Sequence, residues 1–162
     1  MTRVFLSIGS NIDREKNIRA GVAALRECFG ELQLSSVYES EAVGFEGDPF
    51  FNLVAGFETD ATPEEVVTAL RAIEDRHGRV RTGPRFSSRT LDIDLLLYGN
   101  AVFDVPVVIP RKEITRNAFV LLPLAELAPD AVHPLTGKTY AAMWEAFDKA
   151  SQPLWPVAFD WS

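Results

Sequence analysis

Two acidic residues stand at the start of an otherwise apolar stretch, and their spacing suits metal binding. Asp92 and Asp94 are followed by the run LLLY. Side chains alternate between the faces of a strand, so both carboxylates point the same way about 7 Å apart, with Leu96 and Tyr98 next on that face. Like charges this close repel, and a cation is the simplest compensation. Mg²⁺ prefers oxygen ligands and typically takes one or two carboxylates plus substrate phosphates. A solvated strand end is the competing interpretation.

Arginines gather just before this carboxylate pair. In a chain with a net charge of −7, the fourteen residues 76–89 hold Arg76, Arg79, Arg81, Arg85 and Arg89. The planar guanidinium matches phosphate oxygens bidentately, so a basic loop beside two carboxylates predicts a site for a metal-bound polyphosphate. Arginines paired with surface acids are the competing interpretation. The chain has no GxxxxGK[ST] motif, which excludes a P-loop nucleotide site.

Hydrophobic periodicity predicts the elements that position these residues. We expect strands over 3–8, 32–40, 50–58 and 91–98, a helix over 13–29, and a second helix that starts at Thr62 with a capping box to Glu65 and stops at Gly78. The order β-α-β-β-α-β predicts an α+β, ferredoxin-like fold, in which an antiparallel sheet carries both helices on one face. A C-terminal extension should contain an extended piece over 101–109 and helical segments over 119–127 and 140–147.

Composition is typical of one globular domain, which we expect to span residues 1–162. Hydrophobic residues make up 47% and charged residues 24% of the chain. The acidic charge argues against binding to nucleic acid or to a membrane surface. No apolar run approaches the roughly 18 residues that cross a membrane, and the first residues do not resemble a signal peptide. We therefore expect a cytoplasmic monomer, with a weak dimer as the alternative. Cys28 should lie in the core, and Trp144 and Trp155 should pack in the core or in a lid.

Several short motifs occur in a fixed order along the chain. They are IGSN at 8–11, FFN at 50–52, GRVR at 78–81, RTLDID at 89–94 and FVL at 119–121. Together they resemble the 6-hydroxymethyl-7,8-dihydropterin pyrophosphokinase family over nearly the whole chain, from about residue 7 to residue 130. The resemblance, which is to an atypical member, implies transfer of pyrophosphate from ATP to the pterin hydroxymethyl group, with release of AMP, in folate biosynthesis.

The resemblance also implies roles for single residues. Asp92 and Asp94 would hold two Mg²⁺ ions, and the catalytic residues would be Asp94, Arg81 and Arg89. The pterin-binding residues would be Ser40, Glu41, Val43, Phe50, Asn52 and Phe119, with Asn52 on the ring edge and the two phenylalanines on its faces. The nucleotide-binding residues would be Arg71, Glu74, Arg81, Phe86, Arg89, Arg111, Lys112 and Arg116. The loop 79–90 would close over ATP.

Ordinary packing is the competing interpretation for the two phenylalanines, which are more often core than ligand-binding residues. Asn52 is harder to explain in this way, because asparagine is disfavoured in strands and needs a specific partner when it is buried.

A few positions depart from the family pattern. Arg111 stands where the family has histidine, Asn117 stands where it has arginine, and Ser87 and Ser88 replace a glycine and a proline. Arg111 can still donate to a phosphate, but it is always charged, whereas histidine titrates near neutral pH. The alternative function is therefore a divergent paralogue that binds a pterin but has an altered substrate or has lost transferase activity.

Two further classes share the predicted order of elements. One is an RNA-binding domain with aromatic residues on its sheet. The net charge of −7 and the absence of a [KR]-G-[FY]-[GA]-[FY] run argue against it. The other is a regulatory ferredoxin-like domain that binds a metabolite at an oligomer interface, which would leave the arginine–aspartate cluster unexplained.

Overall fold

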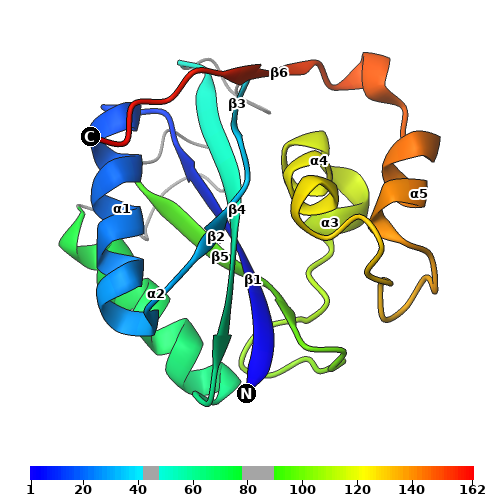
Figure 1. Cartoon of the computed structure of the whole chain (residues 1–162), viewed down its shortest axis with the longest axis horizontal. Coiled ribbons are helices and arrows are strands. Elements are labelled where there is room, and N and C mark those ends of the chain that lie inside the picture. Colours follow the sequence, from blue (N-terminus) through cyan, green and yellow to red (C-terminus); the bar gives the residue numbers. More distant parts are fainter. Residues whose placement is uncertain (42–47, 78–89) are drawn as a thin grey trace.

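The computed structural model describes residues 1–41, 48–77 and 90–162. They form three layers, in which one antiparallel sheet lies between two layers of helices (Figure 1). The first part of the chain contains β1 (Thr2–Ser10), α1 (Arg14–Phe29), β2 (Gln33–Leu34), β3 (Val37–Ser40), β4 (Phe50–Thr59) and α2 (Pro63–Arg76). The second part contains β5 (Asp92–Tyr98), α3 (Glu113–Arg116), α4 (Ala118–Leu127), α5 (Tyr140–Ala146), a 3-10 turn (Lys149–Ser151) and β6 (Leu154–Val157). Within these residues, no helix has both the length and the apolar character needed to cross a membrane.

The sheet confirms the predicted β-α-β-β-α-β order. Its strands run β5-β1-β4-β3-β6, with β2 also paired to β4, and the pairings are antiparallel. The predicted second strand is divided into β2 and β3 around Ser35. The Ser35 N–H donates to the carbonyl oxygen of Val54, and its hydroxyl accepts the Val54 N–H at 2.9 Å. The side chain of Ser35 thus takes a place that a strand backbone would fill.

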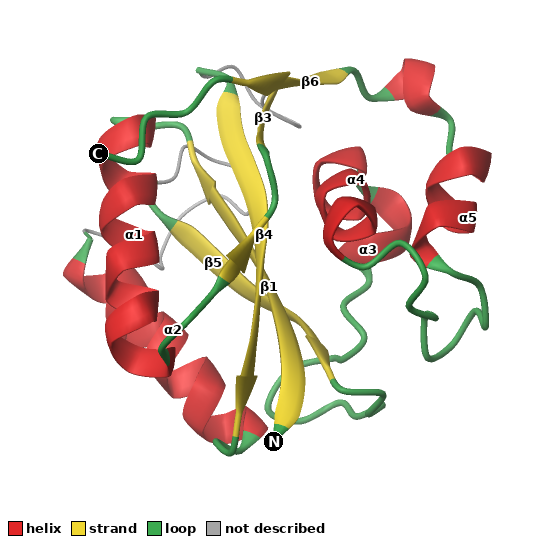
Figure 2. Ribbon diagram, viewed as in Figure 1, coloured by secondary structure: helices red, strands yellow, loops and turns green. Residues whose placement is uncertain are grey.

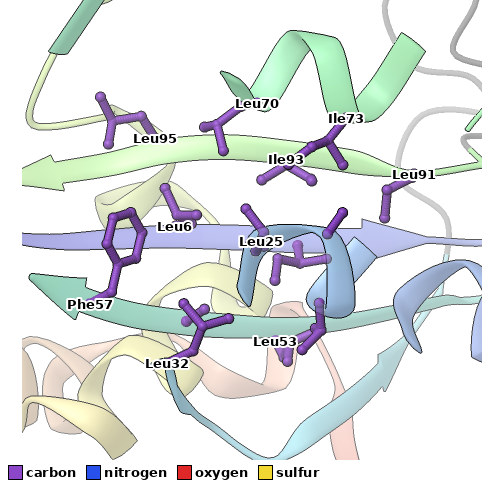
Figure 3. Packing of buried hydrophobic residues seen from close by; sticks show 14 of the residues in the cluster. Leu6, Leu25, Leu32, Leu53, Phe57, Leu70, Ile73, Leu91, Ile93 and Leu95 are labelled. Carbon is purple, nitrogen blue, oxygen red and sulfur yellow. The ribbon is translucent and has the colours of Figure 1, made fainter. Parts of the chain in front are cut away.

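Helices α1 and α2 cover one face of the sheet, as predicted (Figure 2). The helix α2 begins with the predicted capping box, in which the Glu65 N–H donates to Thr62 Oγ1 at 3.2 Å and the Thr62 N–H donates to Glu65 Oε1 at 2.9 Å. The larger hydrophobic cluster lies between these helices and the sheet (Figure 3). Its members include Leu6, Leu25, Leu53, Leu70, Ile73, Ile93 and Leu95.

The C-terminal extension covers the opposite face with α3, α4 and α5 (Figure 1). A second hydrophobic cluster fills this interface; it includes Phe5, Val54, Leu96, Leu97, Ile114, Leu121, Leu124 and Tyr140. Glu126 on α4 also fastens this layer to the sheet, because its carboxylate accepts the Tyr38 hydroxyl at 2.7 Å and the Ser36 N–H at 2.9 Å. The sheet is therefore packed on both faces.

Three details differ from the sequence-based predictions. Strand β6 was not expected; it pairs with β3 and includes Pro156, which strands usually exclude except at an edge. Cys28 is exposed, because the buried stripe of α1 continues from Leu25 toward Phe29 rather than through Cys28. The core position predicted for Cys28 was therefore wrong. Trp155 is 42% exposed on β6, so the core alternative for Trp155 was wrong and packing in a lid stays a prediction.

Candidate functional site

A row of residues crosses the sheet on the face covered by the C-terminal helices. Gly9 on β1 lies directly opposite Asp92 on β5 and directly opposite Asn52 on β4. A Cβ atom placed on Gly9 would lie 2.7 Å from Asn52 Oδ1, which is closer than such atoms approach. Because Gly9 has no side chain, the Asn52 amide can lie over β1, next to the strand β5 that carries the two aspartates. The predicted pterin and metal residues meet at this row.

The two carboxylates share a face, as the spacing predicts, but the face changes further along β5. Ile93 and Leu95 pack in the α1–α2 cluster, which leaves Asp92 and Asp94 on the other side. The register between β1 and β5 then shifts at Leu96, and Tyr98 turns to the α1–α2 side, where its hydroxyl donates to the Ala61 carbonyl at 2.6 Å. The expectation that Tyr98 shares the aspartate face was wrong because a β-bulge resets the alternation.

Crowding of negative charge marks this site electrostatically. The pKa of Asp94 is raised to about 7, first by burial and then by the nearby carboxylates of Asp92, Glu74 and Glu113, while the Arg111 guanidinium partly opposes the rise. Arg111 alone therefore does not compensate the negative charge, which is the condition that favours an added cation.

Arg111 comes to the aspartates from the segment after β5. A bridge between Phe103 and Ile109 turns the chain back, and the Arg111 N–H donates to the Leu96 carbonyl at 3.0 Å. Arg111 Nη2 lies 3.5 Å from Asp94 Oδ1, and its Nε donates to the carboxylate of Glu113. The position that departs from the family pattern is thus in direct contact with a predicted metal ligand.

Glu74, predicted to lie near the nucleotide, is buried on α2 beside this site. Its carboxylate accepts the N–H of Ile93 at 2.9 Å, between the two aspartates in the chain. This bond fastens α2 to the edge strand β5 and fixes the backbone that carries both acids. Arg71 lies one turn earlier on α2 and is exposed.

The described pterin residues gather at the ends of β3 and β4. Ser40 lies opposite Phe50, and the Asn52 amide donates to the Ser40 hydroxyl at 3.2 Å. Phe119 belongs to the first turn of α4 and packs, half-buried, against the second cluster. Glu41 is exposed at the end of β3. The specific partner expected for Asn52 is therefore present.

The other predicted residues fall into two groups. Lys112 directly precedes α3 and Arg116 is its last residue; both are exposed, on the chain segment that also carries Arg111. Val43, Arg81, Phe86 and Arg89, with the predicted closing loop, lie outside the described residues, so their roles stay predictions.

Two contacts of the site region were missed by sequence reasoning. Gln152 lies in the tail before β6; its Oε1 accepts the Ala118 N–H at 2.9 Å, and its Nε2 donates to the Arg116 carbonyl at 2.8 Å. Arg14 pairs with Glu39 at 2.6 Å and donates to the Pro49 carbonyl at 3.0 Å. Both side chains act over long sequence separations, and no local pattern indicates them.

A pocket of about 350 Å³ opens beside Arg14, at the start of α1. It is lined by Asn11, Asp13, Arg14, Asp48 and Pro49, and none of these is a predicted site residue. The candidate site is therefore defined by the chemistry of the carboxylate pair and Asn52 rather than by this pocket.

The structure is a small α+β domain whose antiparallel sheet carries two aspartates on one face of its edge strand β5. The sequence profile of the 7,8-dihydro-6-hydroxymethylpterin-pyrophosphokinase (HPPK) family matches residues 5–129. The chain is also 40% identical over 134 residues to the 2-amino-4-hydroxy-6-hydroxymethyldihydropteridine pyrophosphokinase of Pseudomonas aeruginosa, covering 79% of this chain and 82% of that protein. The chain therefore belongs to the HPPK family.

Larger proteins contain a similar part. The chain is 36% identical over 153 residues to the folic acid synthesis protein fol1 of Schizosaccharomyces pombe, and it covers 20% of that protein. A solved structure of Plasmodium falciparum HPPK-DHPS matches with a TM-score of 0.72 at 12% identity, over 89% of this chain and 45% of that chain. The structural match supports the fold, and this chain spans less than half of that neighbour.

We expect Asp94→Asn to stabilise the metal-free protein at pH 8. The folded-state pKa of Asp94 is about 7, above its ordinary value of 3.8, so the contribution of this group to stability is lost as the pH rises through about 7. Asparagine keeps the shape without the charge. The gain should be on the order of 1 kcal/mol at pH 8, reduced by partial solvent screening, and smaller at pH 5.

Urea unfolding with a chelator present, at pH 5 and pH 8, would measure this difference. Asp104→Asn removes the same charge from an exposed loop position and serves as the control. A variant at Asp94 that is less stable than the wild type at pH 8 would contradict the expected repulsion.

Proposed function

We propose that the chain transfers pyrophosphate from ATP to the hydroxymethyl group of 6-hydroxymethyl-7,8-dihydropterin and releases AMP, as a step in folate biosynthesis. The observation that carries this proposal is the row of Asn52, Gly9 and Asp92 across three strands, which sets a group suited to a pterin edge beside a carboxylate pair suited to a metal. We expect the reaction to depend on Mg²⁺, and the chain to act as a single-domain monomer in the cytoplasm.

The reaction is an in-line displacement, in which the pterin hydroxyl oxygen attacks the β-phosphorus of ATP and the bond to AMP breaks. Positioning and charge neutralisation carry most of such a reaction. Asp92 and Asp94 would hold two Mg²⁺ ions, which when bound neutralise phosphate charge and orient the reacting oxygens. Two hard oxygen donors and a raised Asp94 pKa fit this ion.

The carboxylate pair would fill only part of a metal's coordination shell. Among the described residues, no three histidine, cysteine or acidic side chains group as a ready metal site. The other ligands would come from water and substrate phosphates, as is usual for Mg²⁺.

The pterin side of the proposed site uses flat surfaces and in-plane partners. Asn52 would pair with the ring edge, and its bond to Ser40 holds the amide in one plane. Phe50 and Phe119, which come from β4 and α4, would stack on the ring faces. Ser40, Glu41 and Val43 would supply the remaining contacts to the ring.

The nucleotide side would combine basic residues with the acid Glu74. Arg111, Lys112 and Arg116 come from the segment around α3, and Arg71 and Glu74 come from α2. Arg81 and Arg89 are proposed to neutralise the transferring group, and Phe86 to pack against the nucleotide. The guanidinium groups suit phosphate oxygens because their donors are planar and paired.

A second candidate is a divergent paralogue that binds a pterin without transferring pyrophosphate. The contact of Arg111 with Asp94 favours it, because a permanently charged group lies against a proposed metal ligand. This candidate keeps the pterin residues and loses the metal-dependent step.

We expect AMP to form only when the protein, ATP, Mg²⁺ and 6-hydroxymethyl-7,8-dihydropterin are all present, which chromatography would follow. Asp94→Asn should lower turnover by at least about 100-fold, because charge on the transferring group loses its stabilisation. Asp104→Asn should keep normal turnover. Near-normal turnover in Asp94→Asn would contradict the role of Asp94 as a metal ligand. Pterin binding by the wild type without AMP formation would favour the paralogue.

Gln152 offers a test of how the Phe119 face is held. Gln152→Ala should weaken pterin binding by about 5-fold with little change in kcat, because two hydrogen bonds to the backbone beside Phe119 are lost, worth about 1 kcal/mol in total. Gln152→Glu keeps the acceptor for the Ala118 N–H and should show a smaller loss. Gln33→Ala, an exposed change on β2, is the control. Calorimetric pterin affinity that is equal in all variants would remove Gln152 from the site.

A further inference from the structure

A backbone hydrogen bond from Arg111 to β5 keeps its side chain close to Asp94. The Arg111 N–H donates to the carbonyl of Leu96, two residues after Asp94 on the same strand. The position of the Arg111 backbone is therefore fixed by β5 itself. From this anchor, Nη2 reaches to 3.5 Å from Asp94 Oδ1.

A second carboxylate holds the other side of the guanidinium. Arg111 Nε donates to Glu113, in the first turn of α3. The side chains of Arg111 and Glu113 are only 29% and 30% exposed, so water screens their interaction incompletely. Arg111 thus lies between a proposed metal ligand on β5 and an acid that belongs to a different element.

We propose that Arg111 is a built-in counter-ion of Asp94, which a divalent metal must displace, and that Glu113 retains the guanidinium beside the site after the displacement. The proposal rests on the proposed function, in which Asp94 holds a metal. It adds that the metal affinity of the site is set partly by competition between Arg111 and the incoming ion for Asp94.

Charge and geometry support this competition. A divalent ion on Asp94 would repel the guanidinium across a short distance, and Asp94 Oδ1 cannot serve both cations fully. Glu113 lowers the cost of displacement, because Arg111 keeps a charged acceptor when it leaves Asp94. Arginine stays protonated at all working pH values, so the competition cannot be relieved by loss of a proton. A released guanidinium would still lie where a phosphate could bind it.

Binding of Mn²⁺ alone tests the competition without any enzymatic turnover. Free Mn²⁺ would be measured by electron paramagnetic resonance during titration of the chelator-treated full chain. Arg111→Gln should bind Mn²⁺ about 10-fold more tightly than the wild type, since a competing half-buried cation is removed. Lys112→Gln removes the neighbouring exposed charge and should change the affinity by less than about twofold.

A double-mutant cycle separates two effects of Glu113 on Mn²⁺ binding. One is the attraction of its negative charge for the metal, and the other is its pairing with the Arg111 guanidinium. Glu113→Gln should weaken Mn²⁺ binding in the wild-type background, both because a negative charge is lost and because Arg111 then pairs only with Asp94. In the Arg111→Gln background only the first effect remains, so the loss should be smaller. Equal losses in the two backgrounds would overturn the role of Glu113.

The outcomes also distinguish this inference from the proposed function. Mn²⁺ binding that Asp94→Asn abolishes, but that Arg111→Gln leaves unchanged or weakens, overturns the counter-ion while the metal site stands. Mn²⁺ binding that is absent in every variant, or insensitive to Asp94→Asn, overturns the metal assignment and this inference with it. Tighter binding by Arg111→Gln, lost again when Asp94→Asn is added, supports both.

Discussion

The repulsion between two carboxylates on one strand is the constraint on which the site depends. Regular alternation holds Asp92 and Asp94 on the same face of β5, and burial, together with the nearby carboxylates, raises the pKa of Asp94 to about 7. A flexible loop would relieve such repulsion by moving the acids apart. Here the backbone between them is fixed, because Ile93 is buried in the α1–α2 cluster and its N–H is held by Glu74. The two carboxylates therefore stay close together, and their repulsion is relieved either by protonation of Asp94 or by a bound cation.

The packing of the sheet on both faces supplies the stability that this arrangement requires. One cluster lies under α1 and α2, and the other lies under α3, α4 and α5. Burial of apolar surface on both faces of the sheet offsets a small electrostatic penalty at β5, which is an edge strand paired with β1. The C-terminal layer has a second effect, since it brings Phe119 and Arg111 to the face that carries the acids. The same segment thus stabilises the fold and completes the candidate site.

Local signals in the sequence predicted the elements and the carboxylate pair, and long-range contacts escaped them. The capping box at Thr62 and the alternation at Asp92 involve residues within a few positions of one another. The bulge at Leu96 depends on pairing with β1, and the division of the second strand depends on bonds between Ser35 and Val54. Strand β6 has little apolar alternation and forms because β3 offers an open edge. The family resemblance supplied roles for residues whose positions no periodicity could relate.

Arg111 shows how one residue that departs from the family pattern can change the charge of a site. A neutral histidine beside Asp94 would leave the two carboxylates to a metal, whereas arginine brings a permanent positive charge to the same place. Because Arg111 is bonded through its backbone to β5, it cannot withdraw far when the occupancy of the site changes. Glu113 then becomes part of the same electrostatic unit, although it lies on another element. The metal ligands, the arginine and its second acceptor must therefore be understood together, since altering any one changes the charge that the others experience.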